Sequence, residues 1–213
     1  MTKKVLNYLS LAVGCCACVA AVFYLINTIL TATGFDWTEG TVKTYIYIGL
    51  VIVVLAAATV GLALGGVKLV QAFVAKKDAG TKVIALTMAV YFAAEVILAG
   101  LWIGFFDLGA VRSWIFAVLG IAGLVVTLLP VFGKVDEKNT KLVLLVAAIL
   151  GFVLTIVDLV YSGGVGAVGI VFLMFMYGCA TAIYVTYVVV EGSNAPKAET
   201  KEVEETKEEK TEE

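Results

Sequence analysis

The chain has 213 residues, of which 62% are apolar and 15% charged, and it has a formal net charge of −2 and no histidine. Soluble globular chains average about 45–50% apolar and about 25% charged residues. The polar residues here are too few to cover the apolar ones in water. The composition therefore excludes a soluble domain, a disordered chain and a nucleic-acid-binding protein, and it predicts a polytopic membrane protein.

Six stretches of the chain are long and apolar enough to cross a bilayer. A helix needs about 20 mostly apolar residues to span a hydrocarbon core that is about 30 Å thick. Helices are expected because they satisfy every backbone hydrogen bond within one segment. The sequence therefore predicts an all-α bundle of six transmembrane helices with short loops, which occupies residues 1–190. The expected spans are residues 5–33, 44–66, 83–106, 112–133, 142–162 and 165–190.

The first span begins like a signal peptide, with Lys3 and Lys4 before an apolar run, and residues 11–15 faintly resemble a lipoprotein cleavage box. The apolar run continues to Leu30, well beyond the short core of a signal peptide. We therefore expect an uncleaved first span.

The basic residues predict the orientation, because cytoplasmic loops carry an excess of Lys and Arg. Nine lysines fall on one side of the six spans, whereas only Lys43 and Arg112 fall on the other. This bias places both termini in the cytoplasm, in a plasma (inner) membrane. Aromatic side chains favour the headgroup level, and we expect three to anchor the outer interface. They are Trp37, Trp102 and Trp114. The nine lysines are Lys3, Lys4, Lys68, Lys76, Lys77, Lys82, Lys134, Lys138 and Lys141.

The composition changes sharply after residue 190. Residues 1–190 carry 11 basic and 8 acidic groups, whereas residues 191–213 carry 4 Lys and 9 Glu. A segment with so few apolar residues cannot offset the entropy lost on ordering. We predict a disordered acidic cytoplasmic tail over residues 191–213. The tail either solubilises the chain or docks a basic cytoplasmic partner.

Residues 67–82 form the longest connection between predicted spans. Apolar residues alternate there with Lys68, Gln71, Lys76 and Lys77. This pattern can extend the second helix and lay a basic face on anionic lipid headgroups. Ordinary positive-inside bias explains the lysines equally well.

Glu95 is the best candidate for chemistry, because charged residues inside a membrane are costly and usually face a cavity or the bundle interior. It lies near the middle of the third predicted span, where desolvation favours the protonated carboxyl. One hypothesis is a proton or cation site, and the other is a protonated carboxyl that hydrogen-bonds a neighbouring helix. The expected neutral partners, chosen by depth, are Asn27, Thr59, Thr87, Tyr91, Thr127, Thr155 and Tyr177.

Two aspartates lie closer to the outer boundary and complete the candidate ion or proton site. Asp107 follows the third predicted span, and Asp158 lies in the outer third of the fifth. With Asp36 they mark the outer ends of three helical hairpins, but their unequal spacing does not support duplication. The alternative for Asp158 is an interface residue that reaches headgroup water.

Small residues recur at a spacing of four, which lets helix backbones approach closely. We expect the second span to pack through Ala57, Gly61 and Gly65. The third span would pack through Gly100 and Gly104.

Cysteines cluster in the first span at positions 15, 16 and 18, with Cys179 in the last span. A soft-metal or redox site is conceivable. However, the absence of histidine and the packing qualities of cysteine favour a structural role. We expect no metal and no cofactor.

The function stays open between two classes. The lack of histidine removes Ser-His and Cys-His catalysis and His-ligated metal sites, so we expect no enzyme. The first hypothesis is a non-enzymatic membrane scaffold or accessory subunit, with a membrane protein partner or as a homo-oligomer. The alternative is a small transporter, channel or solute-binding subunit that uses Glu95 with Asp158. A cavity with Glu95 on its wall would favour transport, and a dry bundle would favour the scaffold.

Overall fold

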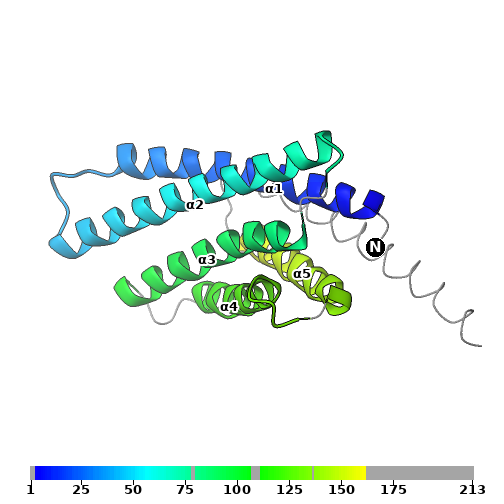
Figure 1. Ribbon diagram of the computed structural model, residues 1–213. Coiled ribbons are helices and arrows are strands. Elements are labelled where there is room, and N and C mark those ends of the chain that lie inside the picture. Colours follow the sequence, from blue (N-terminus) through cyan, green and yellow to red (C-terminus); the bar gives the residue numbers. More distant parts are fainter. Residues whose placement is uncertain (1–2, 78–79, 107–110, 136, 162–213) are drawn as a thin grey trace, which may run out of the picture.

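The computed structural model describes residues 3–77, 80–106, 111–135 and 137–161, and it is helical in every described element (Figure 1). Four helices are long and apolar enough to cross a membrane, and the fifth contains a shorter apolar stretch, Leu142–Asp158. The described part of the chain is thus all-helical, and the protein is an integral membrane protein in contact with the lipid bilayer. The helices are α1 (Lys3–Gly34), α2 (Val42–Val74), α3 (Thr81–Phe105), α4 (Val111–Val131) and α5 (Glu137–Tyr161).

The helices extend beyond the predicted apolar runs at several ends. The extension of the second helix that the pattern of residues 67–82 allowed is seen in part, because α2 continues to Val74. An N-cap explains where α2 begins, since the Thr41 side chain accepts a hydrogen bond from the Thr44 amide. The predicted sixth span and the predicted acidic tail lie outside the described residues, so the count of six spans stays a prediction.

Consecutive helices run antiparallel and pack side by side. Helix α1 packs along α2, α2 along α3, α3 along α4 and α4 along α5. In Figure 1 the long α1–α2 hairpin lies above the shorter α3, α4 and α5. The order follows from the short connections, which leave each helix beside its predecessor.

The α1–α2 turn is held by local contacts rather than by the bundle. The Tyr45 hydroxyl donates to the Trp37 carbonyl at 2.8 Å, and the two rings stack at 6.0 Å. Asp36 accepts two hydrogen bonds from Thr38, one from its amide at 2.9 Å and one from its hydroxyl at 2.6 Å. These two bonds hold the pKa of the exposed Asp36 carboxyl below its usual value.

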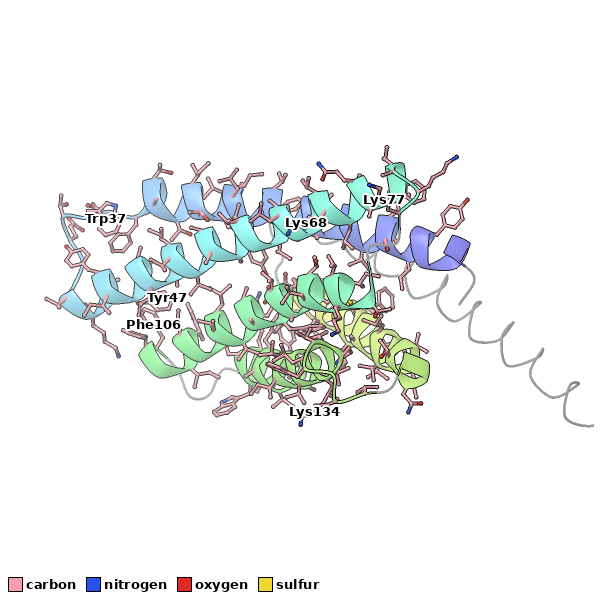
Figure 2. All side chains as sticks on the ribbon, viewed as in Figure 1. Trp37, Tyr47, Lys68, Lys77, Phe106 and Lys134 are labelled. Carbon is pink, nitrogen blue, oxygen red and sulfur yellow. The ribbon has the colours of Figure 1, made fainter. Side chains whose placement is uncertain are left out.

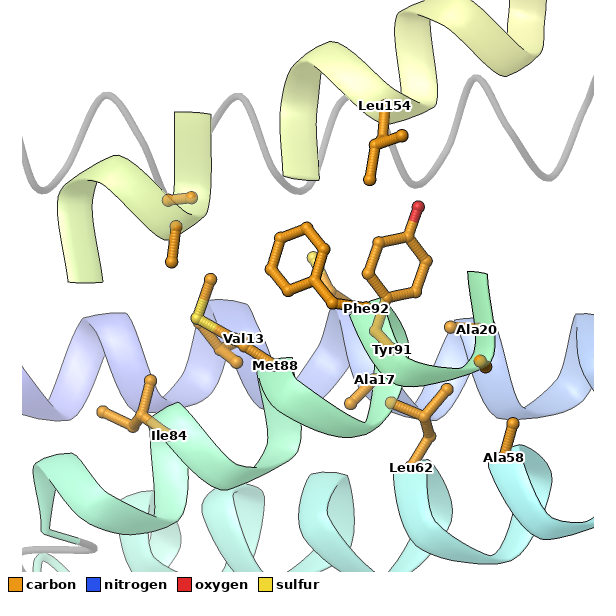
Figure 3. Packing of buried hydrophobic residues seen from close by; sticks show 14 of the residues in the cluster. Val13, Ala17, Ala20, Ala58, Leu62, Ile84, Met88, Tyr91, Phe92 and Leu154 are labelled. Atoms are coloured by element: carbon orange, nitrogen blue, oxygen red, sulfur yellow. The ribbon is translucent and has the colours of Figure 1, made fainter. Parts of the chain in front are cut away.

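The core is built from close backbone approach as well as large side chains. A Cβ added to Gly66 of α2 would lie 2.8 Å from the Gly14 carbonyl oxygen and 2.7 Å from the Cys18 sulfur of α1. Figure 3 shows small α1 residues such as Ala17 and Ala20 facing Leu62 of α2, with Phe92 of α3 deeper in the core. Small residues at a membrane helix interface permit this packing.

The two ends of the bundle differ in composition. We call one the aromatic end, defined by Trp37, Trp102 and Trp114, and the other the lysine end. Figure 2 shows Trp37, Tyr47 and Phe106 together at the aromatic end, with Lys68 and Lys77 toward the other. The tryptophans predicted to anchor one interface thus lie at one end of the bundle. The lysine end is defined by Lys68, Lys76, Lys77, Lys82 and Lys134.

Candidate functional site: a charged cavity at the aromatic end

A cavity of about 450 Å³ opens between four helices at the aromatic end. Its α3 wall contains Glu95, Leu98, Ala99 and Trp102, whose spacing of three and four places them on one helix face. Helices α2, α4 and α5 complete the cavity. Their lining residues are Tyr47, Val51, Arg112, Ser113, Phe116 and Asp158.

Glu95 lies at the deep end of the cavity. It precedes the last residue of α3, Phe105, by ten positions, which is about 15 Å along the helix. The residue is only partly buried, and it borders the cavity, so water in the cavity can reach its carboxyl group. Glu95 therefore combines membrane depth with access from one end of the bundle.

Tyr24 of α1 is the hydrogen-bond partner of this carboxyl. Its hydroxyl donates to Oε1 of Glu95, and the Tyr24 side chain is buried. A phenol is a neutral donor, so it orients the carboxyl without neutralising an ionised form. Within the described residues, no Lys or Arg forms an ion pair with Glu95.

Asp158 is paired with Arg112. The guanidinium Nη2 of Arg112 lies 2.5 Å from Oδ1 of Asp158, and the side chains are 46% and 29% exposed. This pair joins the start of α4 to the end of α5 beside the cavity. An exposed ion pair of this kind stabilises a fold by only about 0.2–1 kcal/mol.

Arg112 and Asp158 each lie at a helix end where the helix macrodipole disfavours their charge. Arg112 lies in the first turn of α4, where the macrodipole favours an anion, and Asp158 lies in the last turn of α5, where it favours a cation. Helix stability therefore does not explain their positions. A pair that violates a local preference is expected at a functional site.

Aromatic rings form much of the outer wall. Tyr47 lies 6.1 Å from Trp102 and 4.6 Å from Phe106 between ring centroids, both in edge-on arrangements. The guanidinium carbon of Arg112 lies 5.5 Å from the centre of the Phe116 ring, a cation–π distance. Tyr47 and Trp102 thus supply aromatic surface to the cavity that Arg112 does not cover.

The structure brings Glu95 and Asp158 to the same cavity, while Asp107 lies outside the described residues. The neutral residues expected beside Glu95 are placed differently. Asn27 is exposed, Tyr91 is buried beside Phe92, and Tyr177 lies outside the described residues. The hydroxyls of Thr59, Thr87, Thr127 and Thr155 donate to carbonyl oxygens of their own helices.

The small residues expected to pack helices divide into two groups. Gly61 and Gly65 face α3, where an added Cβ would meet Val90 and Thr87, respectively. Ala57 is exposed, and Gly100 and Gly104 have no described heavy atom within 4 Å of an added Cβ. The three described cysteines, at positions 15, 16 and 18, lie on α1 and form no disulfide within the described residues, while Cys179 lies outside them.

Tyr24 and Arg112 were missed as site residues by sequence reasoning. One signal could have found Tyr24, because it precedes the end of α1 at Gly34 by ten residues, just as Glu95 precedes the end of α3. Helices α1 and α3 end at the same end of the bundle, so equal counts mean similar depth. Arg112 could have been matched to Asp158 in the same way, since both lie within one turn of that end.

Comparison of the chain with protein-family models, with curated proteins and with solved structures finds no match. The three charged groups of the cavity can bind a cation or exchange a proton at Glu95, and its walls can hold a small molecule. The volume lies within the range of small-molecule pockets, about 300–1,000 Å³.

Proposed function

We propose that this protein is a small membrane transporter, channel or solute-binding subunit, with Glu95 as its proton or cation site and Asp158 near the mouth. The proposed role is not that of an enzyme. The observation that carries it is the cavity that connects Glu95 to the aromatic end. An intramembrane carboxylate is costly, and it usually lies on an ion or proton pathway.

The same observation weakens the scaffold hypothesis. Interhelical hydrogen bonding alone requires a dry contact between Glu95 and Tyr24, and it gives no reason for a cavity of about 450 Å³ beside them. The Arg112–Asp158 pair at the mouth supports the same conclusion, since its charges oppose both helix dipoles.

One observation keeps the accessory-subunit role as the second candidate. Gly100 and Gly104 form a bare small-residue face on α3, with no described heavy atom within 4 Å of an added Cβ. Such a face suits the close approach of another helix. The predicted span at residues 165–190 could occupy this face as well as a helix of a partner protein could, so we rank the accessory role lower.

We further propose that the cavity opens to the outside of a plasma (inner) membrane, with the amino terminus in the cytoplasm. The support is the distribution of charge, since the lysine end carries most of the basic residues and the cavity lies at the other end.

Flux in proteoliposomes tests the function. The purified protein is reconstituted with an internal pH-sensitive dye, and a potassium gradient with valinomycin imposes a membrane potential. We expect proton or ²²Na⁺ entry above that of protein-free liposomes. Glu95→Gln should reduce the entry to the protein-free rate, because it removes the ionisable group and keeps an acceptor for Tyr24.

The matched control is Asp36→Asn, which makes the same change in the exposed α1–α2 turn and should leave the flux unchanged. Wild-type protein that conducts neither ion would overturn the transporter and channel roles and restrict the proposal to solute binding. A Glu95→Gln variant with wild-type flux would overturn Glu95 as the ion site. A stoichiometric protein partner retained in mild detergent, together with absent flux, would establish the accessory role instead.

A further inference from the structure

The cavity carries an excess of negative charge once its ion pair is counted. Arg112 and Asp158 neutralise each other at 2.5 Å, so neither charge is available without breaking the pair. Glu95 has only the neutral Tyr24 hydroxyl as a hydrogen-bond donor among the described side chains. When Glu95 is ionised, one negative charge in the cavity has no cationic partner in the described chain.

The walls of the cavity are unsuited to a small inorganic ion alone. Inorganic cations such as Na⁺ and Mg²⁺ are held by several oxygen ligands. The lining instead offers the rings of Tyr47 and Trp102 and the apolar side chains of Val51 and Leu98. Aromatic faces attract cations, and most strongly when the site is desolvated. An apolar and aromatic wall beside one carboxylate suits an organic cation better than a metal ion.

We propose that the cavity binds a monovalent organic cation, an amine or quaternary ammonium with an apolar or aromatic body. The cationic head lies at Glu95, and the body packs against Tyr47, Trp102 and Leu98. This inference rests on the proposed function and names its substrate class. An organic anion is disfavoured, because it would have to displace Asp158 from Arg112 and lie near Glu95.

The organic cation and a proton compete for the same carboxylate. If Glu95 is protonated in the empty protein, the cation displaces the proton, which leaves to the water of the cavity, so total charge is conserved. Within the described helices, the titratable or charged groups around Glu95 are Tyr24 of α1, Tyr47 of α2, Arg112 of α4 and Asp158 of α5.

Isothermal titration of the detergent-purified full chain with benzyltrimethylammonium tests the inference without any flux measurement. We expect saturable binding, with benzylsulfonate as the control that has the same ring and the opposite charge. As the pH is lowered through the titration of Glu95, affinity should fall by up to about tenfold per unit, because one proton and one cation exclude each other. Titration in two buffers of different ionisation enthalpy should detect the released proton.

Paired variants locate the site. Glu95→Gln should weaken binding and abolish its pH dependence, while Asp36→Asn should alter neither. Trp102→Leu should weaken binding by roughly threefold to thirtyfold, as expected for the loss of a cation–π contact. Trp114→Leu makes the same change at the same end of the bundle, at a residue outside the described cavity lining, and should bind as wild type does.

The outcomes separate this inference from the proposed function. Ion flux that depends on Glu95, without benzyltrimethylammonium binding, would overturn the substrate class and leave the function intact. Equal binding of benzylsulfonate, or pH-dependent binding that survives Glu95→Gln, would also overturn the substrate class. Binding with the expected variant pattern but no flux would support the substrate class and restrict the function to solute binding.

Discussion

Helices α1 and α2 are in close contact around Gly66, whereas the helices around Glu95 are separated by a cavity. Around Gly66 the backbones of α1 and α2 meet, and the nearby void between α1, α2 and α3 is only about 10 Å³. Around Glu95 four helices surround a cavity of about 450 Å³. Helices α2 and α3 contribute to both regions, and they pack against α1 in the first and against α4 and α5 in the second.

Residue size and charge explain the contrast. Glycine and alanine let neighbouring backbones approach, and large rings and charged groups hold them apart. On α2 the small residues Gly61, Gly65 and Gly66 lie toward the lysine end, and Tyr47 and Val51 lie toward the aromatic end. One helix is thus tightly packed along one half and lines a cavity along the other.

Filling the tight region gives the largest expected effect on stability. Gly66→Ala places a methyl group against the Gly14 carbonyl and the Cys18 sulfur, so α1 and α2 must separate. We expect a loss of about 1–3 kcal/mol in the free energy of unfolding, as is typical of overpacking. Chemical unfolding in detergent, followed by far-UV circular dichroism, measures it.

Gly49→Ala is the matched control on the same helix. No described heavy atom lies within 4 Å of its added Cβ, and alanine favours the helix more than glycine does. Its stability should be unchanged or slightly raised. If both variants lose the same stability, the tight contact around Gly66 is not what holds this half of the bundle together.

Breaking the ion pair at the cavity mouth should have a smaller effect. A double-mutant cycle with Arg112→Gln and Asp158→Asn should give a coupling of about 0.2–1 kcal/mol, because both side chains are partly exposed. Each single variant also removes an unfavourable helix-dipole interaction, which offsets part of its cost. Unfolding in the same detergent measures the cycle. A coupling energy as large as the stability lost in Gly66→Ala would show that the ion pair is a main stabilising contact of the bundle and contradict its description as a weak, partly exposed pair.

The smallest effect concerns the α1–α2 turn and acid pH. Because the Thr38 hydrogen bonds lower the pKa of Asp36, the ionised carboxylate stabilises the turn. This stabilisation is present above the unfolded pKa of about 4 and is lost as pH falls through the lower folded value. The Thr38 amide resonance should shift over that acid range. Asp36→Ala should abolish the shift, and a shift that persists would assign it to another group.

Sequence reasoning predicted the helices well because length and apolar composition are local properties. The expected second span, residues 44–66, was shorter than α2, because backbone hydrogen bonding continues through the polar residues up to Val74. Hydropathy indicates which residues suit the hydrocarbon core of a bilayer. The ends of a helix are set instead by its capping residues and by the turns that follow it. The sixth span stays a prediction.

The candidate site was predictable only in part. Glu95 was identified because a charge at membrane depth is rare. Its partner Tyr24 and the Arg112–Asp158 pair depend on the rotation of each helix about its own axis. Spans that are apolar on every side carry little information about that rotation. Depth could therefore be inferred from the chain, while the facing residues required the three-dimensional packing.

The unequal lengths of the helices bear on how the bilayer meets this protein. Helix α2 has 33 residues, or about 50 Å, whereas α4 has 21, or about 32 Å. The α1–α2 hairpin must therefore tilt, stand out of the hydrocarbon or thicken the lipid around it, while α4 matches a core of about 30 Å. A thinner bilayer would consequently increase the hydrophobic mismatch of the hairpin that supplies Tyr24 and Tyr47 more than that of the helix that supplies Arg112. Lipid thickness thus acts unequally on α2 and α4, which line the same cavity.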